Sequence, residues 1–116
     1  IMVHRKNIAM IELNQPIDTV IQEILRSTFS RLPLCKGGAD NIVGILHVKS
    51  LIREMRLYEG SQKAIDILSL ATEPWFVPEK TTLFDQLQAF RERREHFAVV
   101  VDEYGVLQGV VTLEDI

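Results

Sequence analysis

The sequence predicts an α/β (α+β) fold of two tandem β-α-β-β-α units packed with pseudo-two-fold symmetry. The first observation is an internal repeat, because residues 17–52 and 82–116 show the same order of elements at an offset of 64–65 residues. The second is that each copy joins an amphipathic helical pattern to two short apolar runs that flank a turn. We therefore expect residues 1–60 to form the first unit, residues 61–73 a linking helix, and residues 74–116 the second unit, truncated at its last helix.

The first copy begins with a helix that Pro16 opens, at a position where the missing N–H costs little. Its apolar residues recur at helical spacing: Ile17, Val20, Ile21, Ile24 and Leu25. Two strands are predicted over 32–35 and 42–47, on either side of a turn with two glycines. Helical spacing then returns over 48–58, and the linking helix follows from Ala64, Ile65, Leu68 and Ala71.

The second copy begins with an extended segment, Trp75 to Pro78, followed by the capping-box pattern Thr82-x-x-Asp85 that starts a helix. Strands are predicted over 96–101 and 106–112, joined by a four-residue turn that ends in glycine. Within the repeat we align Leu32-Pro33-Leu34 with Phe97-Ala98-Val99, and residues 43–46 with residues 108–111. A further helix is expected to begin near Thr112 or Leu113, and both chain ends suggest a piece of a longer protein.

Composition excludes several classes of function. Hydrophobic residues make up 47% of the chain and the net charge is −3, which favours a folded domain over disorder and offers no basic excess for nucleic acid. No apolar run approaches the roughly 18 residues that a membrane span needs, and no signal peptide is present, so direct membrane insertion is not expected. The single cysteine, Cys35, excludes an internal disulfide and a multi-cysteine metal site. The three histidines lack ligand spacing, so no metal site is expected.

The repeat resembles a pair of CBS domains, also called a Bateman module. Its second copy ends in Gly109-Val110-Val111-Thr112-Leu113-Glu114-Asp115, which resembles the Gly-h-h-Thr-x-x-Asp pattern of these domains, where h is apolar. Residues 96–116, HFAVVVDEYGVLQGVVTLEDI, are similar to the CBS pair of the CorC/HlyC hemolysin-like, magnesium and cobalt efflux family. Residues 43–49, VGILHVK, resemble the first CBS unit of the same family.

The resemblance implies a regulatory module and no catalysis. Such pairs lie on the cytoplasmic side of the membrane, as soluble domains between a membrane-embedded domain and a C-terminal domain of the parent protein. They commonly form homodimers and bind AMP or ATP, with or without magnesium, as regulatory ligands and not as tightly bound cofactors. The resemblance therefore implies an adenine-nucleotide-binding module that controls an attached ion-transport domain. The alternative is a ligand-free dimerisation module of the same parent protein.

The best candidate contacts for a nucleotide are Thr112 and Asp115, which match the family pattern. A carboxylate can accept hydrogen bonds from both ribose hydroxyls, and a hydroxyl at a helix start suits a phosphate oxygen. The alternative is that both residues only cap their own helix. In the first copy, His47 and Ser50 stand at these positions, and a serine cannot hold a ribose diol as a carboxylate does. We therefore expect at most one good nucleotide site per chain.

An adenine pocket needs apolar walls, and the family pattern suggests Val77, Pro78, Ala98 and Val99. The alternative for each is an ordinary place in the core. The aromatic pair Trp75 and Phe76 could stack on a base or pack between the units. The basic residues Lys49, Arg53 and Arg56 share one helix face, where they could meet polyphosphate, an acidic partner or only solvent.

Overall fold

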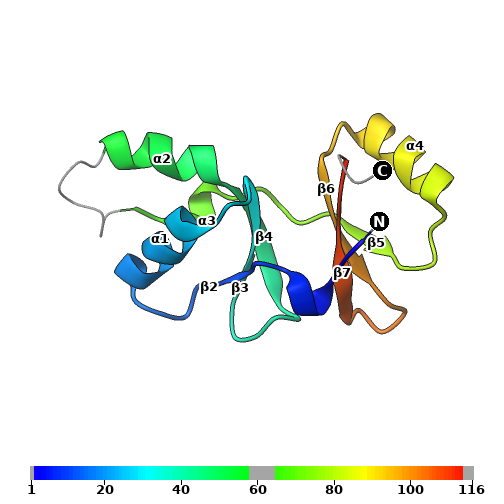
Figure 1. Ribbon diagram of the computed structural model, residues 1–116, viewed down its shortest axis with the longest axis horizontal. Helices are drawn as coiled ribbons and strands as arrows, with labels where there is room; N and C mark the ends of the chain where they lie inside the picture. The colour runs from blue at the N-terminus through cyan, green and yellow to red at the C-terminus, as the bar shows by residue number, and fades with distance from the viewer. Residues whose placement is uncertain (1, 58–64, 114–116) are drawn as a thin grey trace. The chain divides into compact units, whose positions relative to one another are not determined.

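The computed structural model describes residues 2–57 and 65–113 and divides the chain into two compact units. We call residues 9–74 the N-terminal unit, and residues 75–116 together with residues 1–8 the C-terminal unit. The elements of both units are drawn in Figure 1. No helix among the described residues is long and apolar enough to cross a membrane.

The N-terminal unit contains a three-stranded sheet in the order β2-β3-β4. Strand β2 runs parallel to β3, and β3 is antiparallel to β4. The elements follow the chain as β2 (Ile11–Glu12), α1 (Ile17–Arg26), β3 (Arg31–Cys35), β4 (Ile42–His47), α2 (Val48–Leu57) and α3 (Ile67–Leu70). The predicted strands and helices of this copy are thus confirmed to within about one residue at each described end.

Helix α1 covers this sheet because its apolar residues lie on one face. Val20, Ile21 and Ile24 are buried, whereas Leu25 on the predicted stripe is exposed. They share a core with Leu51 of α2 and with strand residues of the sheet: Ile11, Leu32, Leu34 and Leu46. Both helices therefore pack against the sheet by burying aliphatic side chains, the main favourable contribution to folding.

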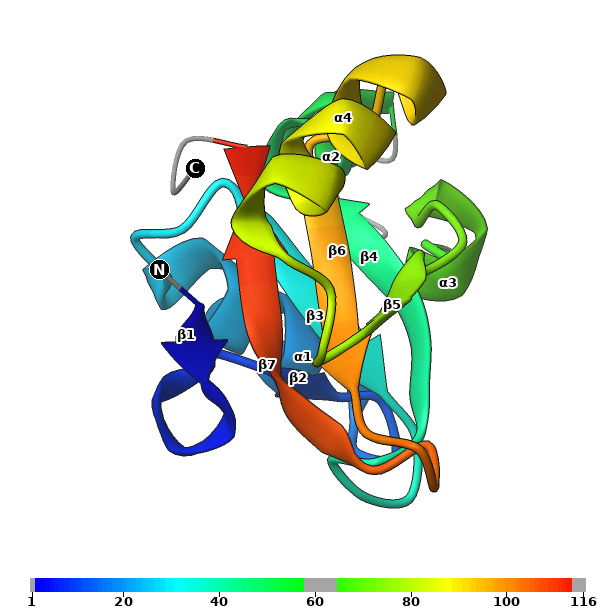
Figure 2. The ribbon, with the colours of Figure 1, turned by 90° about the vertical axis from the view of Figure 1, so that its right-hand side faces the viewer.

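The C-terminal unit contains a four-stranded sheet in the order β1-β7-β6-β5. Its elements are β1 (Val3–His4), the 3₁₀ turn η1 (Arg5–Asn7), β5 (Phe76–Pro78), α4 (Leu83–Arg93), β6 (Phe97–Val101) and β7 (Leu107–Thr112). Strand β5 is parallel to β6, and β6 is antiparallel to β7. Figure 2 shows α4 beside this sheet, where its Phe90 packs with Val77, Ala98, Val100 and Val111.

Helix α4 starts where the sequence predicts. The Oγ1 atom of Thr82 accepts a hydrogen bond from the Asp85 N–H at 3.2 Å, which satisfies one of the free donors of the first turn. The helix ends at Arg93, and the capping residue Arg94 has a φ of 55°, so a bulky residue adopts the left-handed conformation there.

The two β-hairpins share one register, which corrects the sequence alignment by one residue. Leu34 pairs with Gly44, and Val100 pairs with Gly109, with the same irregularity one residue further on in each hairpin. Leu34 is therefore equivalent to Val100, so the alignment of Leu34 with Val99 is wrong. The first turn has one extra residue, which lies after Leu34. Alternate residues of a strand face opposite sides of the sheet. Because Ala98 packs against α4, its neighbour Val99 faces away from α4.

Both hairpins are extended at their outer strand by a segment that precedes the other unit in sequence. Val3 of β1 pairs with Val110 of β7, and Thr72 forms an antiparallel bridge with Ile45 of β4. Gly109 directly precedes Val110, and Gly44 directly precedes Ile45. A Cβ on Gly109 would collide with the Val3 carbonyl oxygen, and one on Gly44 would lie 2.9 Å from the Ala71 Cβ. Glycine is required at both positions because the neighbouring segments approach closely.

The link between the two copies contains less helix than the sequence predicts. Among the described residues from 65 onward, only Ile67–Leu70 is helical, and Ala71 follows in an extended conformation. The rest of the predicted linking helix lies outside the described residues. The predicted last helix also lies there, apart from its expected first residues: Thr112 ends β7, and Leu113, the last described residue, follows in a 3₁₀ conformation.

Candidate functional site

Thr112 lies at the last position of β7, opposite Phe97, the first residue of β6. It is half-buried, and the following N–H, that of Leu113, donates to the His96 carbonyl at 2.9 Å. This end of the sheet is therefore formed by the end of β7 and the start of β6. Asp115, the other residue of the predicted pair, lies outside the described residues.

Val77 and Pro78 lie together at the opposite end of the same strands. Pro78 pairs with Val101, the last residue of β6, four positions from Phe97. At about 3.3 Å per residue, this separates Pro78 from the Thr112 end of the sheet by about 13 Å. The structure therefore brings Val77 and Pro78 together but does not bring them to Thr112.

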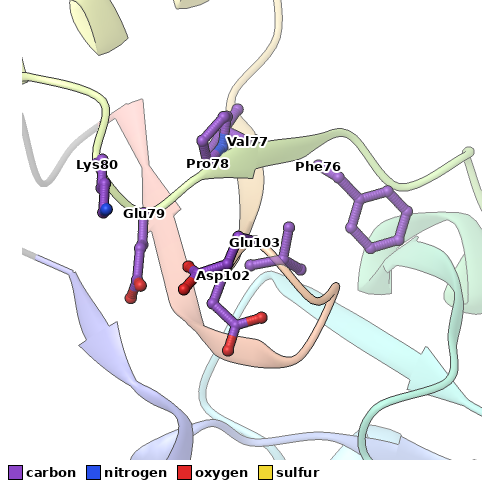
Figure 3. A pocket seen from close by; sticks show the side chains of 8 residues that line it. Phe76, Val77, Pro78, Glu79, Lys80, Asp102 and Glu103 are labelled. Carbon is purple, nitrogen blue, oxygen red and sulfur yellow. The ribbon is translucent and has the colours of Figure 1, made fainter.

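A cavity of about 310 Å³ opens beside Val77 and Pro78 (Figure 3). Its apolar wall includes Phe76, whose side chain is 49% exposed. Its charged lip consists of Glu79, Lys80, Asp102 and Glu103, and Val101 completes the lining. This lip is mainly acidic, which disfavours the phosphate groups of a nucleotide.

Asp102 has a structural role at this lip. Its Oδ1 atom accepts hydrogen bonds from the N–H groups of Tyr104 and Val106 at 2.8 and 2.9 Å, and its Oδ2 atom accepts one from the Gln108 side chain at 3.2 Å. The carboxylate thus holds the β6–β7 turn in place, as an aspartate at the first position of a turn commonly does.

Ala98 and Val99 are neighbours on β6, and neither side chain is accessible to solvent. Ala98 packs in the core with Phe90 of α4, whereas Val99 pairs with Phe76 and Val110 on its two sides. Neither residue lines the cavity in Figure 3.

Trp75 and Phe76, the two aromatic residues, have different surroundings. The Trp75 ring packs edge-on against Phe90, with ring centroids 4.9 Å apart, and the Arg93 guanidinium lies 4.9 Å from its centre. These contacts hold Trp75 against α4. Phe76 instead stays half-exposed at the cavity.

Sequence reasoning missed a larger cavity of about 530 Å³ in the N-terminal unit. It lies where β2 and β3 begin and α1 ends, and it is lined by Ala9, Met10, Ile11, Glu23, Arg26, Ser27, Thr28, Phe29 and Leu32. Phe29 is 54% exposed, so one aromatic ring is available to a ligand, and the two hydroxyl side chains supply polar contacts. Apolar walls with a few polar groups are typical of small-molecule sites. In the sequence, Phe29, an aromatic residue that follows Ser27 and Thr28, is the signal that could have indicated this cavity.

His47 takes the place of Thr112 in the N-terminal unit, as the sequence predicts. It ends β4 opposite Arg31, just as Thr112 ends β7 opposite Phe97. Partial burial and the positive charges of Arg31, Lys49 and Arg53 lower the pKa of His47 below its ordinary value. Ser50, the residue opposite Asp115, lies half-buried in the first turn of α2.

Within residues 2–57 and 65–113, no group of three or more histidine, cysteine, aspartate or glutamate side chains is arranged to hold a metal ion. Cys35 is buried, and burial raises the pKa of its thiol, with a smaller effect of the nearby Glu12. A buried thiol with a raised pKa is a poor nucleophile.

Comparison with known families matches the chain twice to the family described as "CBS domain", over residues 2–57 and 64–116. Among curated relatives, the chain is 40% identical over 116 residues to Hemolysin C of Brachyspira hyodysenteriae. It is 39% identical over 116 residues to the magnesium and cobalt efflux protein CorC of Pasteurella multocida (strain Pm70). All of this chain aligns in both cases, but it spans only 41% and 38% of these relatives.

Solved structures show the same fold over nearly the whole chain. A CBS-domain pair with bound AMP from Klebsiella pneumoniae is 36% identical, with a TM-score of 0.91, and the match covers 99% of this chain and 90% of that one. The CBS domain of the bacterial CNNM/CorC family Mg²⁺ transporter in complex with ATP is 32% identical, with a TM-score of 0.84. That match covers 99% of this chain and 80% of the other.

Proposed function

Since the chain belongs to the CBS domain family, as a tandem pair of the CNNM/CorC and hemolysin-like type, we propose that it binds an adenine nucleotide and thereby regulates an attached membrane ion-transport domain. The observation that carries this proposal is the pair of nucleotide-bound neighbours, one with AMP and one with ATP, which share over 30% identity with this chain. The proposal assigns the chain no reaction of its own.

The proposed contacts of the nucleotide begin with Thr112 and Asp115. The Thr112 side chain lies at a strand end that precedes the predicted helix, and the first N–H groups of such a helix would favour a phosphate oxygen. Asp115 would accept hydrogen bonds from the ribose hydroxyls. Magnesium, where it takes part, would arrive with the phosphates of ATP, since the described residues offer no metal cluster of their own.

For the adenine ring we propose the apolar residues of the second copy, Val77 and Pro78 with Ala98 and Val99, which belong to the same unit as Thr112. Phe76 is half-exposed at this cavity, where it would stack on the base. Phe76→Ala should therefore weaken nucleotide binding about tenfold, in keeping with the loss of one stacking contact, and Phe29→Ala in the N-terminal unit should change it less than twofold. The opposite ranking would contradict this placement of the base.

Regulation requires that the nucleotide bind two states of the protein with different affinity. We place the transport domain in the parent protein, on the membrane, and this module on the cytoplasmic side. Two copies of the chain would form a homodimer. Leu25 of α1 and Ile52 of α2 are exposed, and together with Met55 and Arg56 they line a shallow groove of about 380 Å³ that suits a helical partner surface.

The function can be tested by thermal unfolding of the chain with AMP, ADP and ATP, each with and without magnesium. A ligand that binds only the folded state should stabilise it by about 2.7 kcal/mol at a hundredfold excess over the dissociation constant. Asp115→Ala should abolish the stabilisation, whereas Asp66→Ala, which removes an exposed carboxylate in the N-terminal unit, should preserve it.

The second candidate function is a dimerisation module without a ligand. It is favoured by Ser50, which replaces a carboxylate in the first unit, and by the exposed apolar groove between α1 and α2. A folded dimer whose unfolding temperature does not change with any nucleotide would support this function and contradict the nucleotide-binding function.

A further inference from the structure

Residues 2–8 lie along the outer side of β7 in the C-terminal unit, and we call them the strap (Figure 2). The strap contains β1 and η1, and both of these elements contact β7. Val3 pairs with Val110 and His4 pairs with Gly109, in antiparallel orientation. The strap is therefore the neighbour of β7 on the side that β6 does not occupy.

Two side chains of the strap add to this pairing. The Arg5 guanidinium donates a hydrogen bond to the Leu107 carbonyl oxygen at 3.1 Å. The Met2 side chain covers Gly109 so closely that a Cβ there would lie 2.7 Å from the Met2 Sδ atom. The strap thus holds β7 from its first residue to Val110.

The strap is nevertheless a weakly attached part of the sheet. Val3 and Arg5 are only half-buried, and Met2 is exposed, whereas Val110 and Val111 of β7 belong to the core. A two-residue strand with few buried side chains opens at a small fraction of the free energy of global unfolding. We therefore expect the strap to leave β7 in local fluctuations while β5, β6 and β7 stay paired.

Strand β7 leads directly from the strap to Thr112. Val110 and Thr112 are two residues apart on this strand, so their Cα atoms are about 7 Å apart and their side chains lie on one face. On the inner side, Thr112 pairs with Phe97 of β6. Departure of the strap would leave the outer side of β7 without its neighbour in the sheet, and the end of the strand at Thr112 would be held from one side.

We propose that the strap is a conformational switch, whose docked state binds the nucleotide more tightly than its undocked state. This inference rests on the proposed function, because it takes Thr112 and Asp115 as nucleotide contacts. The coupling is reciprocal, so a nucleotide that prefers the docked state also stabilises the strap on β7. The chain passes from the strap into the N-terminal unit at residues 8–9, so a bound nucleotide would restrain one of the two covalent connections between the units.

The test is amide hydrogen exchange of the full 116-residue chain, measured residue by residue by NMR. Exchange is compared without ligand and at saturation with AMP, or with ATP and magnesium. Saturation should slow exchange of the protected β1 amides by about fivefold or more, the lower end of typical coupling between sites. Strand β2 is the matched control, since it is also a two-residue strand at a sheet edge but belongs to the N-terminal unit. Its exchange should change less than twofold.

The reverse measurement uses a variant of the strap. Val3→Ala/Arg5→Ala removes its two half-buried side chains, so it should leave the β1 amides unprotected and weaken nucleotide binding about fivefold or more in titration calorimetry. Unchanged exchange in β6 verifies that the rest of the sheet is intact. The control Lys6→Ala/Asn7→Ala changes two exposed side chains of the same strap and should alter neither measurement more than twofold.

The outcomes separate this inference from the proposed function. Unchanged β1 exchange at saturation, or equal slowing in β1 and β2, would overturn the switch while nucleotide binding stands. So would a Val3→Ala/Arg5→Ala variant with unprotected β1 amides that binds the nucleotide as tightly as the wild type. A wild type that binds neither nucleotide would instead overturn the proposed function, and the switch with it.

Discussion

At the scale of single residues, Glu12 shows how one carboxylate can fix a turn. Its oxygens accept hydrogen bonds from the N–H groups of Asn14, Gly37 and Gly38, at 2.9 to 3.1 Å. Two of these donors belong to glycines with positive φ, so the carboxylate holds a backbone conformation that few other residues adopt. The donors, led by Asn14 and Gly37, lower the pKa of Glu12 below its ordinary value.

This pKa direction predicts a dependence of stability on pH. Because the folded-state pKa is lowered, the stabilisation is fully present above the unfolded-state pKa and is lost as pH falls through the folded-state pKa. Glu12→Gln should therefore unfold at lower urea concentration than the wild type at pH 7, and the difference should shrink below about pH 4. Glu73→Gln, at an exposed position, is the control. A Glu12→Gln difference that stays constant from pH 7 to pH 2.5 would contradict the account.

Gly109 is the residue on which the docking of β1 depends most. A Cβ there would collide with the Val3 carbonyl oxygen and with the Met2 side chain. Gly109→Ala should destabilise the chain by about 1–3 kcal/mol, the usual cost of overpacking. Hydrogen exchange should show faster exchange in β1 and at Val110 than in β3. Unchanged protection of these amides would show that β1 does not require the glycine.

At the scale of elements, the sequence predicts the hairpins and helices well because local signals determine them. Pro16, the apolar stripe of α1 and the glycines of both turns act within a few residues, and the corresponding elements are observed. Register is different, because it depends on pairing between distant segments. The one-residue shift of β6 makes Val100, and not Val99, the equivalent of Leu34, and no local pattern in the sequence shows this. Ala98 and Val99, which the family pattern suggests for the base, are both buried in this structure.

The C-terminal end of α4 offers a test at this scale. Arg94 adopts a φ of 55° and donates its N–H to the Phe90 carbonyl. A helix end in this left-handed conformation favours glycine. Arg94→Gly should raise the free energy of unfolding by about 0.5–1 kcal/mol, the net of relieved strain and added freedom of the unfolded chain. Arg91→Gly, inside the same helix, should lower it by about 1 kcal/mol. Urea unfolding of both variants checks the signs, and two losses would contradict the assigned helix end.

At the scale of the whole molecule, the chain is a repeat of two copies. In each copy, the second strand of the hairpin pairs with a segment that precedes the other copy in sequence. β1 precedes β2 in sequence yet pairs with β7, and Thr72 precedes β5 yet pairs with β4. No local pattern predicts such pairing, since a two-residue strand has no periodicity of its own. The family resemblance, by contrast, is determined by the hairpin and the Gly-h-h-Thr-x-x-Asp motif, and the matches to CBS domains confirm it.

At this scale, the two copies also differ in the residues that they carry at equivalent strand ends. The same strand ends carry Phe97 and Thr112 in one unit and Arg31 and His47 in the other, so one fold supplies two chemically different positions. The sequence shows the substitutions directly, but only the register shows that Arg31 lies beside His47. The larger cavity at Phe29 could not be predicted either, because side chains from three separate segments of the chain line it.

The central claim is that this chain binds an adenine nucleotide through its second CBS copy. Titration calorimetry of ATP and AMP, with magnesium, against the wild type and Asp115→Ala tests it most directly. We predict saturable binding to the wild type with one nucleotide per chain, and at least a tenfold loss of affinity in Asp115→Ala with the fold intact. A folded wild type that releases no heat of binding with either nucleotide, or an Asp115→Ala variant that binds as tightly as the wild type, would contradict the claim.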